Sequence, residues 1–220
     1  MSKVINFGEE VQGYNIKVLN EREIRAAAGI LFLFTLISFM QIIFKGDFVM
    51  IKYVITAFLV DFLIRVFVNP KFSPTLIIGR FFVKNQTPEY VGAAQKKFSW
   101  YIGVALSATM FIHMVLMNAY GPITGITCLI CLAFLFFESV FGICLGCKFY
   151  NLFYKEKAQH CPGEVCDVKA KQDIQKITGV QLMIVLGFIL FIVATVFVMK
   201  GEYSKKPYDI FGIDKKIEAK

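Results

Sequence analysis

Long apolar stretches, several of them about 20 residues long and nearly free of charge, constrain this chain more than any other feature. A helix of roughly that length crosses the ~30 Å hydrocarbon core of a bilayer. The composition agrees, because 57% of the 220 residues are hydrophobic and only 18% are charged, whereas a soluble domain keeps roughly a quarter of its residues charged. The sequence therefore predicts an all-α, polytopic integral membrane protein and argues against a globular cytosolic enzyme.

Local signals place the first helix and a short one. Asn20 followed by Glu23 has the spacing of a capping box, so a helix should begin there. Ser73-Pro74 is a favourable N-cap and first-turn pair. It opens the run 75–83, which at roughly ten residues is too short to span and is expected as an interfacial or re-entrant helix.

The expected architecture has four core transmembrane helices and a C-terminal fifth. The core spans are expected at about 26–44, 49–68, 100–118 and 122–147, and the fifth at 181–199. Trp100 is expected at the membrane interface, and the fourth segment is long enough, at ~39 Å as helix, for its end to leave the hydrocarbon. The chain then divides into an N-terminal segment (1–25), a four-helix core (26–147) with loop 69–99, a Cys-containing polar loop (148–180), the fifth helix (181–199) and a polar tail (200–220).

The charge balance concerns the membrane rather than nucleic acid. The chain has 24 Lys and Arg against 16 Asp and Glu, a net charge of +8, but these bases flank apolar segments, where they orient helices against anionic headgroups. We therefore expect a lipid bilayer and no nucleic acid as partner. By the positive-inside rule the N-terminus and loops 69–99 and 148–180 are cytoplasmic. The tail, outside after five crossings, disagrees because it carries Lys200, Lys205 and Lys206.

Six cysteines form three close pairs in the sequence. Cys128 and Cys131 lie in the middle of an apolar segment, where cysteine behaves as a small hydrophobic residue. The other two pairs lie at the end of the fourth segment and in the polar loop, and these four are the candidate catalytic residues: Cys144, Cys147, Cys161 and Cys166.

The two outer pairs have several chemical options. A Pro-Gly turn between Cys161 and Cys166 would let their sulfurs meet, as a disulfide or around a metal. With His160, the four cysteines also form an alternative zinc set; no other metal or cofactor is expected. A helix that stayed regular through Cys147 would place that thiol at the negative end of its dipole, which raises a thiol pKa. A reactive cysteine here therefore requires the helix to break near Gly142.

Some of these residues belong to an ordered set of motifs. The set consists of Val60 to Arg65 with its Asp61, Lys71-Phe72-Ser73-Pro74 with Arg80, and the run from Glu138 to Tyr150 that contains Cys144 and Cys147. It resembles a small bacterial inner-membrane family, domain of unknown function forty-three ninety-five, over about residues 20–154. Some members are encoded near thioredoxin-like proteins or thiosulfate sulfurtransferases. The resemblance thus implies a bacterial inner membrane, thiol or sulfur chemistry, and a partner of one of those two classes.

Four charged residues inside the apolar segments are the other candidate site. Asp61 and Arg65 have the spacing of a helical ion pair, which either faces a bundle interior or cavity or lets Arg65 snorkel to the headgroups. Adding Arg80 and the helix start at Ser73 would make an anion site. Glu138 could carry protons or receive an anchor from Arg65 or Arg80; otherwise it is expected to be protonated and hydrogen-bonded.

Three functions of different classes remain open from the sequence. The first is a thiol-active membrane protein that relays electrons or sulfane sulfur through its paired cysteines. The second is a transporter of a small sulfur-containing anion, with Arg65, Arg80 and Glu138 along the path. The third is a non-catalytic accessory subunit of a membrane complex, and whether the protein is an enzyme stays open.

Overall fold

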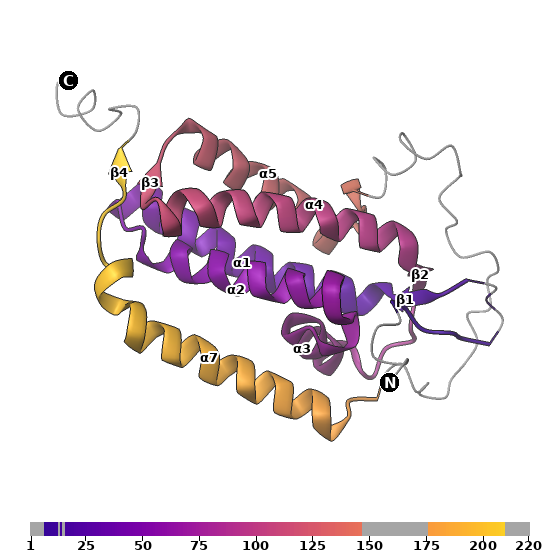
Figure 1. Ribbon diagram of the computed structural model, residues 1–220. Coiled ribbons are helices and arrows are strands. Elements are labelled where there is room, and N and C mark those ends of the chain that lie inside the picture. Colours follow the sequence, from indigo (N-terminus) through magenta and orange to yellow (C-terminus); the bar gives the residue numbers. More distant parts are fainter. Residues whose placement is uncertain (1–6, 13, 15, 147–175, 210–220) are drawn as a thin grey trace.

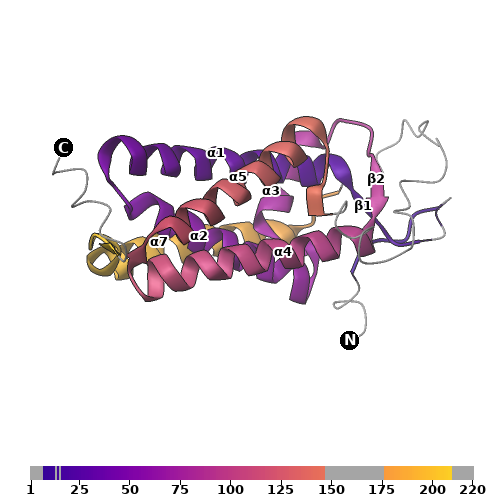
Figure 2. The same ribbon diagram turned by 90° about the horizontal axis from the view of Figure 1, so that it is seen from above.

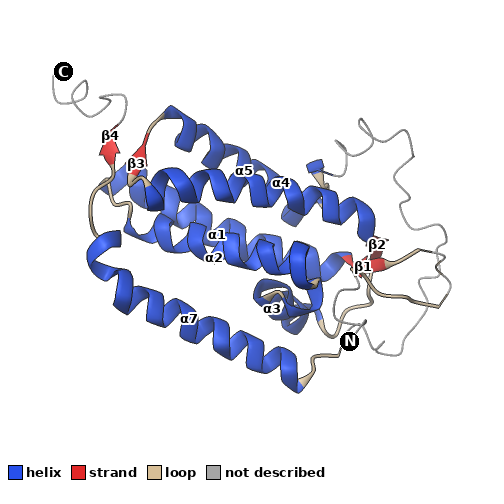
Figure 3. Ribbon diagram, viewed as in Figure 1, coloured by secondary structure: helices blue, strands red, loops and turns tan. Residues whose placement is uncertain are grey.

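The computed structural model describes residues 7–12, 14, 16–146 and 176–209, and these are almost entirely helical (Figures 1 and 3). Six α-helices make up the described part: α1 (Glu21–Lys45), α2 (Val49–Leu63), α3 (Pro74–Val83), α4 (Ala93–Phe111), α5 (Pro122–Phe141) and α7 (Gly179–Tyr203). Short π-helical turns, η1 (Ile64–Val68) and η3 (Ile112–Leu116), extend α2 and α4, and a 3-10 turn, η2 (Pro70–Phe72), precedes α3.

Four of the described helices are long and apolar enough to cross a membrane: α1, α4 with η3, α5 and α7. This confirms the predicted all-helical membrane protein. The predicted second span, α2 with η1, is not among the four, and it carries three charged residues, Lys52, Asp61 and Arg65. The short helix α3 has ten residues, as expected from its sequence.

The helices pack side by side with two opposite ends (Figure 1). In Figure 2, α5 runs obliquely between α1 and α4, and it contacts both. At one end α1, α4 and α7 begin, α2 and α5 finish, and α3 packs against α1; we call this the polar end. At the other, the far end, α1 finishes and α5 begins. Each end carries one small strand pair: β1 (Val18–Asn20) antiparallel to β2 (Tyr90–Gly92) at the polar end, and β3 (Ala119–Tyr120) parallel to β4 (Tyr208–Asp209) at the far end.

The predicted helix boundaries rest on local capping, and most of them are confirmed. Asn20 caps α1 by accepting a hydrogen bond from the backbone N–H of Arg22, although Glu23 bonds to the Asn20 side chain rather than to its backbone. The Ser73 hydroxyl caps α3, with Pro74 in the first turn. Asn69 adopts an extended conformation and stops the helix before Pro70.

One expectation about the membrane segments is wrong. The fourth segment does not run helically to Cys147, because α5 ends at Phe141 and Gly142 takes a left-handed φ of 65°, a conformation that glycine adopts without strain. Trp100 faces the other helices. It is only 1% exposed and belongs to a core cluster with Ile24, Phe62 and Leu135, so its ring stabilises the junction of α1, α2, α4 and α5.

Helix α7 packs differently from the rest of the bundle. No residue in its most apolar stretch is buried, and its only fully buried side chains lie at its two ends, Gln181 and Tyr203. Gln181 donates to the backbone carbonyl of Lys71 at 3.0 Å, and the Tyr203 hydroxyl lies 3.1 Å from that of Thr56. The helix is thus attached by polar contacts at its ends, and its middle is left to the lipid chains or to another protein.

Candidate functional site

Asp61 is the centre of a buried network beneath α3. Its carboxylate accepts hydrogen bonds from Arg65 Nε at 2.8 Å, Ser73 Oγ at 2.8 Å and the Thr75 backbone N–H at 3.0 Å. The Asp61 and Arg65 side chains are 0% and 2% exposed. The guanidinium also lies over the rings of Phe62 and Trp100, at 4.5 and 5.3 Å from their centroids. Arg65 therefore faces the bundle interior, and the expectation that it snorkels to the headgroups is wrong.

The same network occupies the start of α3, where the sequence predicts an anion site. A helix N-terminus attracts negative charge through its free N–H groups, but at α3 the Asp61 carboxylate already holds that position by bonding to Ser73 and Thr75. Arg80 lies at the other end of α3 and pairs elsewhere. The structure thus replaces an external anion with a carboxylate of the chain itself.

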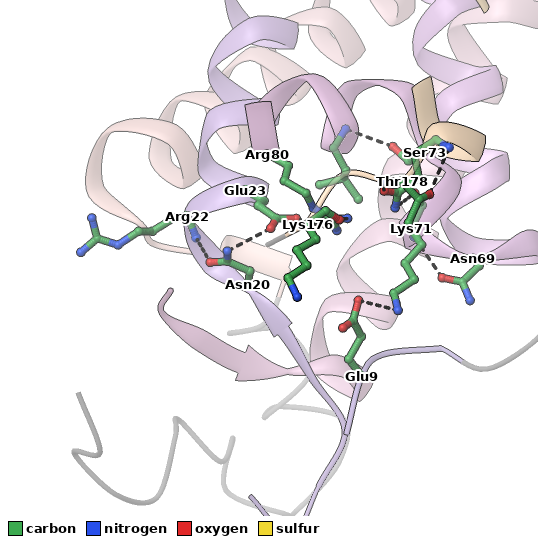
Figure 4. Close-up of polar contacts among 12 residues, drawn as sticks. Glu9, Asn20, Arg22, Glu23, Asn69, Lys71, Ser73, Arg80, Lys176 and Thr178 are labelled. Atoms are coloured by element: carbon green, nitrogen blue, oxygen red, sulfur yellow. Dashed lines mark hydrogen bonds and ion pairs between the residues drawn. The ribbon is translucent and has the colours of Figure 1, made fainter. Parts of the chain in front are cut away.

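Arg80 forms a second ion pair, with the first turn of α1 (Figure 4). Its Nη2 lies 3.0 Å from Glu23 Oε2, and the two side chains are each 6% exposed. Glu23 also accepts from Asn20 Nδ2 at 3.0 Å, and Arg80 Nη1 reaches the Lys176 carbonyl at 3.5 Å. These contacts tie α1, α3 and the start of the α7 segment together at the polar end.

A small pocket of about 20 Å³ opens beside this pair. Arg80 and Glu23 line it, together with Lys71 and Glu9, whose Nζ and Oε1 atoms pair at 3.0 Å (Figure 4). Its volume matches about one water molecule. The Arg80 Nε–H group has no hydrogen-bond acceptor among the described residues. The pocket has room for one water molecule, whose oxygen would accept this hydrogen bond.

Glu138 pairs with Lys96, a residue of α4 that precedes the predicted third span. Lys96 Nζ lies 2.8 Å from Glu138 Oε1 and 2.8 Å from Glu21 Oε2. The Lys96 side chain is 1% exposed and those of the two glutamates 14% or less. The expected anchor from Arg65 or Arg80 is therefore wrong. The missed signal was the position of Lys96, one helical turn before the buried Trp100.

Cys144 leaves the helix, as the requirement for a reactive thiol predicts. It follows Gly142, where α5 ends, and it is not in a disulfide. Its Sγ donates to the Ser99 hydroxyl at 3.2 Å. Gly146 is pressed so closely against the same serine that a Cβ there would lie 2.4 Å from Ser99 Oγ. The stretch after α5 is thus fixed against α4, one turn beyond Lys96.

The other predicted thiol and zinc residues lie outside the described part of the chain: Cys147, His160, Cys161 and Cys166. Within the described ranges, no group of three or more His, Cys, Asp or Glu side chains could hold a metal ion. Cys128 is buried in a core cluster with Leu132 and Met110, in line with the packing interpretation of that cysteine pair.

The comparison with family profiles covers most of this site. The profile of Domain of unknown function (DUF4395) matches residues 19–155, more than half of the chain. The chain belongs to the DUF4395 family. The matched range agrees with the resemblance seen in the sequence, and it includes every helix from α1 to α5 as well as Cys144. No curated protein and no solved structure matches the chain.

A polar contact that sequence reasoning missed joins the DUF4395 region to the segment after α7. Lys52, 1% exposed, donates from its Nζ to Asn118 Oδ1 at 2.7 Å and to the Lys205 carbonyl at 2.8 Å. The Tyr53 and Tyr203 rings pack beside it, with centroids 4.8 Å apart. The available signal was the same as for Asp61, a charged residue inside an apolar segment. We call this contact, with the β3–β4 pair, the far-end clasp.

Proposed function

We propose that this DUF4395 protein is a thiol-active protein of the bacterial inner membrane. It exchanges electrons or sulfane sulfur with a thioredoxin-like or sulfurtransferase protein at the polar end. The observation that supports this most is the break at Gly142, which takes Cys144 out of α5. The connection that carries Cys161 and Cys166 also supports it, because it leaves after Gly146 and returns at Lys176, beside Arg80, at that same end.

The membrane placement is part of the proposal. In this proposal α2 with η1 crosses the bilayer as a fifth span. Its charged residues Asp61 and Arg65 do not prevent this, because they form an ion pair inside the bundle and face away from lipid. The polar end lies in the cytoplasm, since the basic N-terminal segment and loop 69–99 meet there. Cytosolic thiols are kept reduced, so Cys144 starts as a thiol and reacts only transiently.

The proposed chemistry is exchange through a mixed disulfide. The Cys144 thiolate attacks one sulfur of a disulfide on the partner protein, forming a Cys144–partner disulfide and releasing the partner's second sulfur as a thiolate. A second thiolate of this chain, for which Cys147 is the candidate by its position, then displaces the partner and leaves an intramolecular disulfide. With a persulfide-carrying partner, the same attack by Cys144 on the outer sulfur moves that sulfur to Cys144 and frees the partner's thiolate.

A trapping experiment tests the proposal. The probe is a thioredoxin-like protein whose resolving cysteine is replaced and whose remaining cysteine is activated as a disulfide with a small thiol. It should form a covalent adduct with the wild-type protein, visible on a non-reducing gel. Cys144→Ser should lose most of that adduct. Cys131→Ser is the matched control, because it changes a cysteine inside α5 and away from the polar end. An adduct of equal yield in Cys144→Ser and the control would overturn the proposal.

A second candidate, a non-catalytic accessory subunit, is favoured by one observation. The apolar middle of α7 has no buried residue in the described structure, as expected for a helix that packs against another membrane protein. Purification of a stable complex with a second membrane protein, unchanged when all six cysteines are replaced, would select this function over thiol exchange.

The anion-transport alternative has the least support from the geometry. Arg65, Arg80 and Glu138 each already form an ion pair within the chain, so an anion path along them would require breaking buried pairs. Sulfite or thiosulfate uptake into proteoliposomes that survives replacement of the cysteines but not Arg80→Gln would restore this alternative.

A further inference from the structure

A second group of sulfur atoms lies in the middle of the bundle, away from Cys144. Cys128 and Cys131 on α5 line one cavity of about 20 Å³ with Met110 on α4. The other lining residues are apolar, apart from the hydroxyls of Thr35 and Ser107. Both hydroxyls donate to carbonyls of their own helices, at 2.7 and 2.8 Å. Among the residues that line this cavity, Cys128, Cys131 and Met110 are thus the ones whose side chains carry soft metal ligands.

The spacing explains why both thiols reach one place. Residues three apart lie on the same face of a helix, about 5 to 6 Å apart at Cβ, which is too far for a relaxed disulfide. Two thiols at that distance can instead lie on either side of one atom. Met110 brings a thioether from the neighbouring helix, and it is only 4% exposed, so its position is fixed by packing.

We propose that Cys128, Cys131 and Met110 form an intramembrane site for a soft monovalent metal ion, copper(I). Thiolate and thioether sulfurs are the ligands that select copper(I) over harder cations. Charge balance in an apolar cavity also favours a monovalent ion, because a net charge buried there costs several kcal/mol or more. One thiol loses its proton to water as its sulfur binds the metal, and that single thiolate cancels the charge of copper(I), while the second thiol and the thioether bind as neutral donors.

The site is independent of the thiol exchange proposed for Cys144. Helix α5 separates the two, since Cys131 lies about three turns before the break at Gly142. Cys144 lies at the polar end, and Cys147, Cys161 and Cys166 follow it in the sequence, so a chain with all four replaced by Ser is the background in which copper binding at the cavity is measured. The opposite readouts keep the proposals apart, because Cys144→Ser should abolish partner trapping and spare copper, whereas changes at the cavity should do the reverse.

The test is copper(I) binding to the detergent-solubilised full chain carrying Cys144→Ser, Cys147→Ser, Cys161→Ser and Cys166→Ser, under anaerobic, reducing conditions and in competition with a coloured copper(I) chelator. We expect the protein to bind copper(I), and Cys128→Ala and Cys131→Ala should each weaken the affinity by at least about tenfold. Loss of a residue that only supports a metal ligand already costs that much, so loss of a ligand should cost no less. Met110→Leu preserves volume and apolarity and should fold normally, yet it should also weaken the competition. The four-serine chain without further changes should keep the copper bound at the cavity.

Two results would overturn the copper site. One is competition that is the same in the four-serine chain with and without Met110→Leu, Cys128→Ala or Cys131→Ala. The other is copper binding that is already abolished in the four-serine chain, which would place the metal on the cysteines that follow α5. Circular dichroism of each variant, compared with the wild type, shows whether a loss of binding comes from the missing ligand or from a misfolded bundle. Should the cysteine variants misfold, Met110→Leu alone decides, because unchanged affinity there refutes the three-sulfur site.

Discussion

The two ends of the bundle hold buried cations in opposite ways. At the polar end each buried cation among the described residues has a carboxylate partner: Arg65 has Asp61, Arg80 has Glu23, and Lys96 has Glu21 and Glu138. At the far end Lys52 is equally buried, yet the described residues that bind its ammonium are an amide oxygen and backbone carbonyls. Ion pairs thus join α1 to α3, α4 and α5, and the hydrogen bonds of Asp61 join α2 to the start of α3. At the far end, a lysine bound to neutral oxygens holds the segment after α7.

The comparison predicts that breaking a pair at the polar end costs the most. Asp61→Asn should destabilise the fold by about 3–5 kcal/mol, because it leaves the Arg65 guanidinium buried without its countercharge. Reversible unfolding in mixed detergent micelles measures the free energy. Glu89→Gln is the matched control, since it removes one partner of the exposed Arg22–Glu89 pair and should cost no more than about 1 kcal/mol.

A double substitution sharpens the same test. Asp61→Leu combined with Arg65→Met removes both charges and should recover much of the stability lost in Asp61→Asn, because a buried pair replaced by apolar side chains is often neutral. Equal losses in Asp61→Asn and in the exposed-pair control would show that the Asp61 network does not stabilise the polar end. The argument that Asp61 takes the place of an external anion would then fail as well.

The far-end clasp should be weaker but local. Lys52→Met keeps the aliphatic stem and removes the ammonium, leaving Asn118 Oδ1 and the Lys205 carbonyl without that donor. We expect a loss of about 1–3 kcal/mol, and a much larger change in the protection of the chain after Tyr203 than in α1 or α2. Hydrogen exchange or limited proteolysis of residues 203–209 reads this out. Uniform loss of protection across all helices would show that Lys52 stabilises the whole bundle instead.

Two glycines with nearly the same backbone geometry compare the ends directly. Gly46 caps α1 at the far end with φ 63°, and Gly142 caps α5 at the polar end with φ 65°. A Cβ at Gly46 would meet nothing within 4 Å, whereas one at Gly142 would lie 3.2 Å from the Arg25 guanidinium. Gly46→Ala should therefore lower the free energy of unfolding by about 1 kcal/mol, because alanine is strained in the left-handed conformation. Gly142→Ala should lower it further, because its methyl group also displaces the Arg25 side chain.

The glycine pair also bears on the thiol proposal. Arg25 Nη2 donates to the Val140 carbonyl at 3.3 Å, so a displaced Arg25 uncovers the last carbonyls of α5. The alkylation rate of Cys144 by a maleimide should then change in Gly142→Ala and stay unchanged in Gly46→Ala. Equal stability losses in the two variants, with equal alkylation rates, would contradict a special role for the polar-end break.

Local signals in the sequence predicted the parts of this fold that depend on a few neighbouring residues. Asn20, Ser73 and Asn69 mark the ends of helices correctly, and Gly142 marks the break that a reactive Cys144 requires. The pairings across helices could not be read in the same way. The long spans are apolar on all sides, so no polar face indicates which helix is the neighbour.

The missed partners follow from that limit. Lys96 and Glu138 are 42 positions apart, and Lys52 and Lys205 are 153 apart. Nothing in either local sequence names the other residue. What the sequence did offer was the charge itself, because an ionisable residue inside an apolar segment needs a buried partner. Applied to Lys52 as it was to Asp61, that rule would have predicted that Lys52 has a buried partner, though not which one. Lys96 precedes the predicted third span, so the rule did not reach it.

The smallest expected effect is a pH dependence at the polar end. Tyr90 lies on β2 outside the membrane spans, where burial, with smaller contributions from Tyr14 and two glutamates, raises its pKa to about 12 from 10.0. Between these two values the unfolded chain releases a proton that the folded chain keeps. The tyrosine's contribution to stability is therefore complete below pH 10 and is lost as the pH rises toward 12.

The measurement is the difference in unfolding free energy between wild type and Tyr90→Phe as a function of pH. It should be flat up to about pH 10 and then shift against the wild type. Solvent screening reduces the size of that shift, because the Tyr90 side chain is only half-buried. A difference that stays flat through pH 11 would mean that the β1–β2 pair opens at the polar end well before the helices separate, and would place the stability of that end in its ion pairs alone.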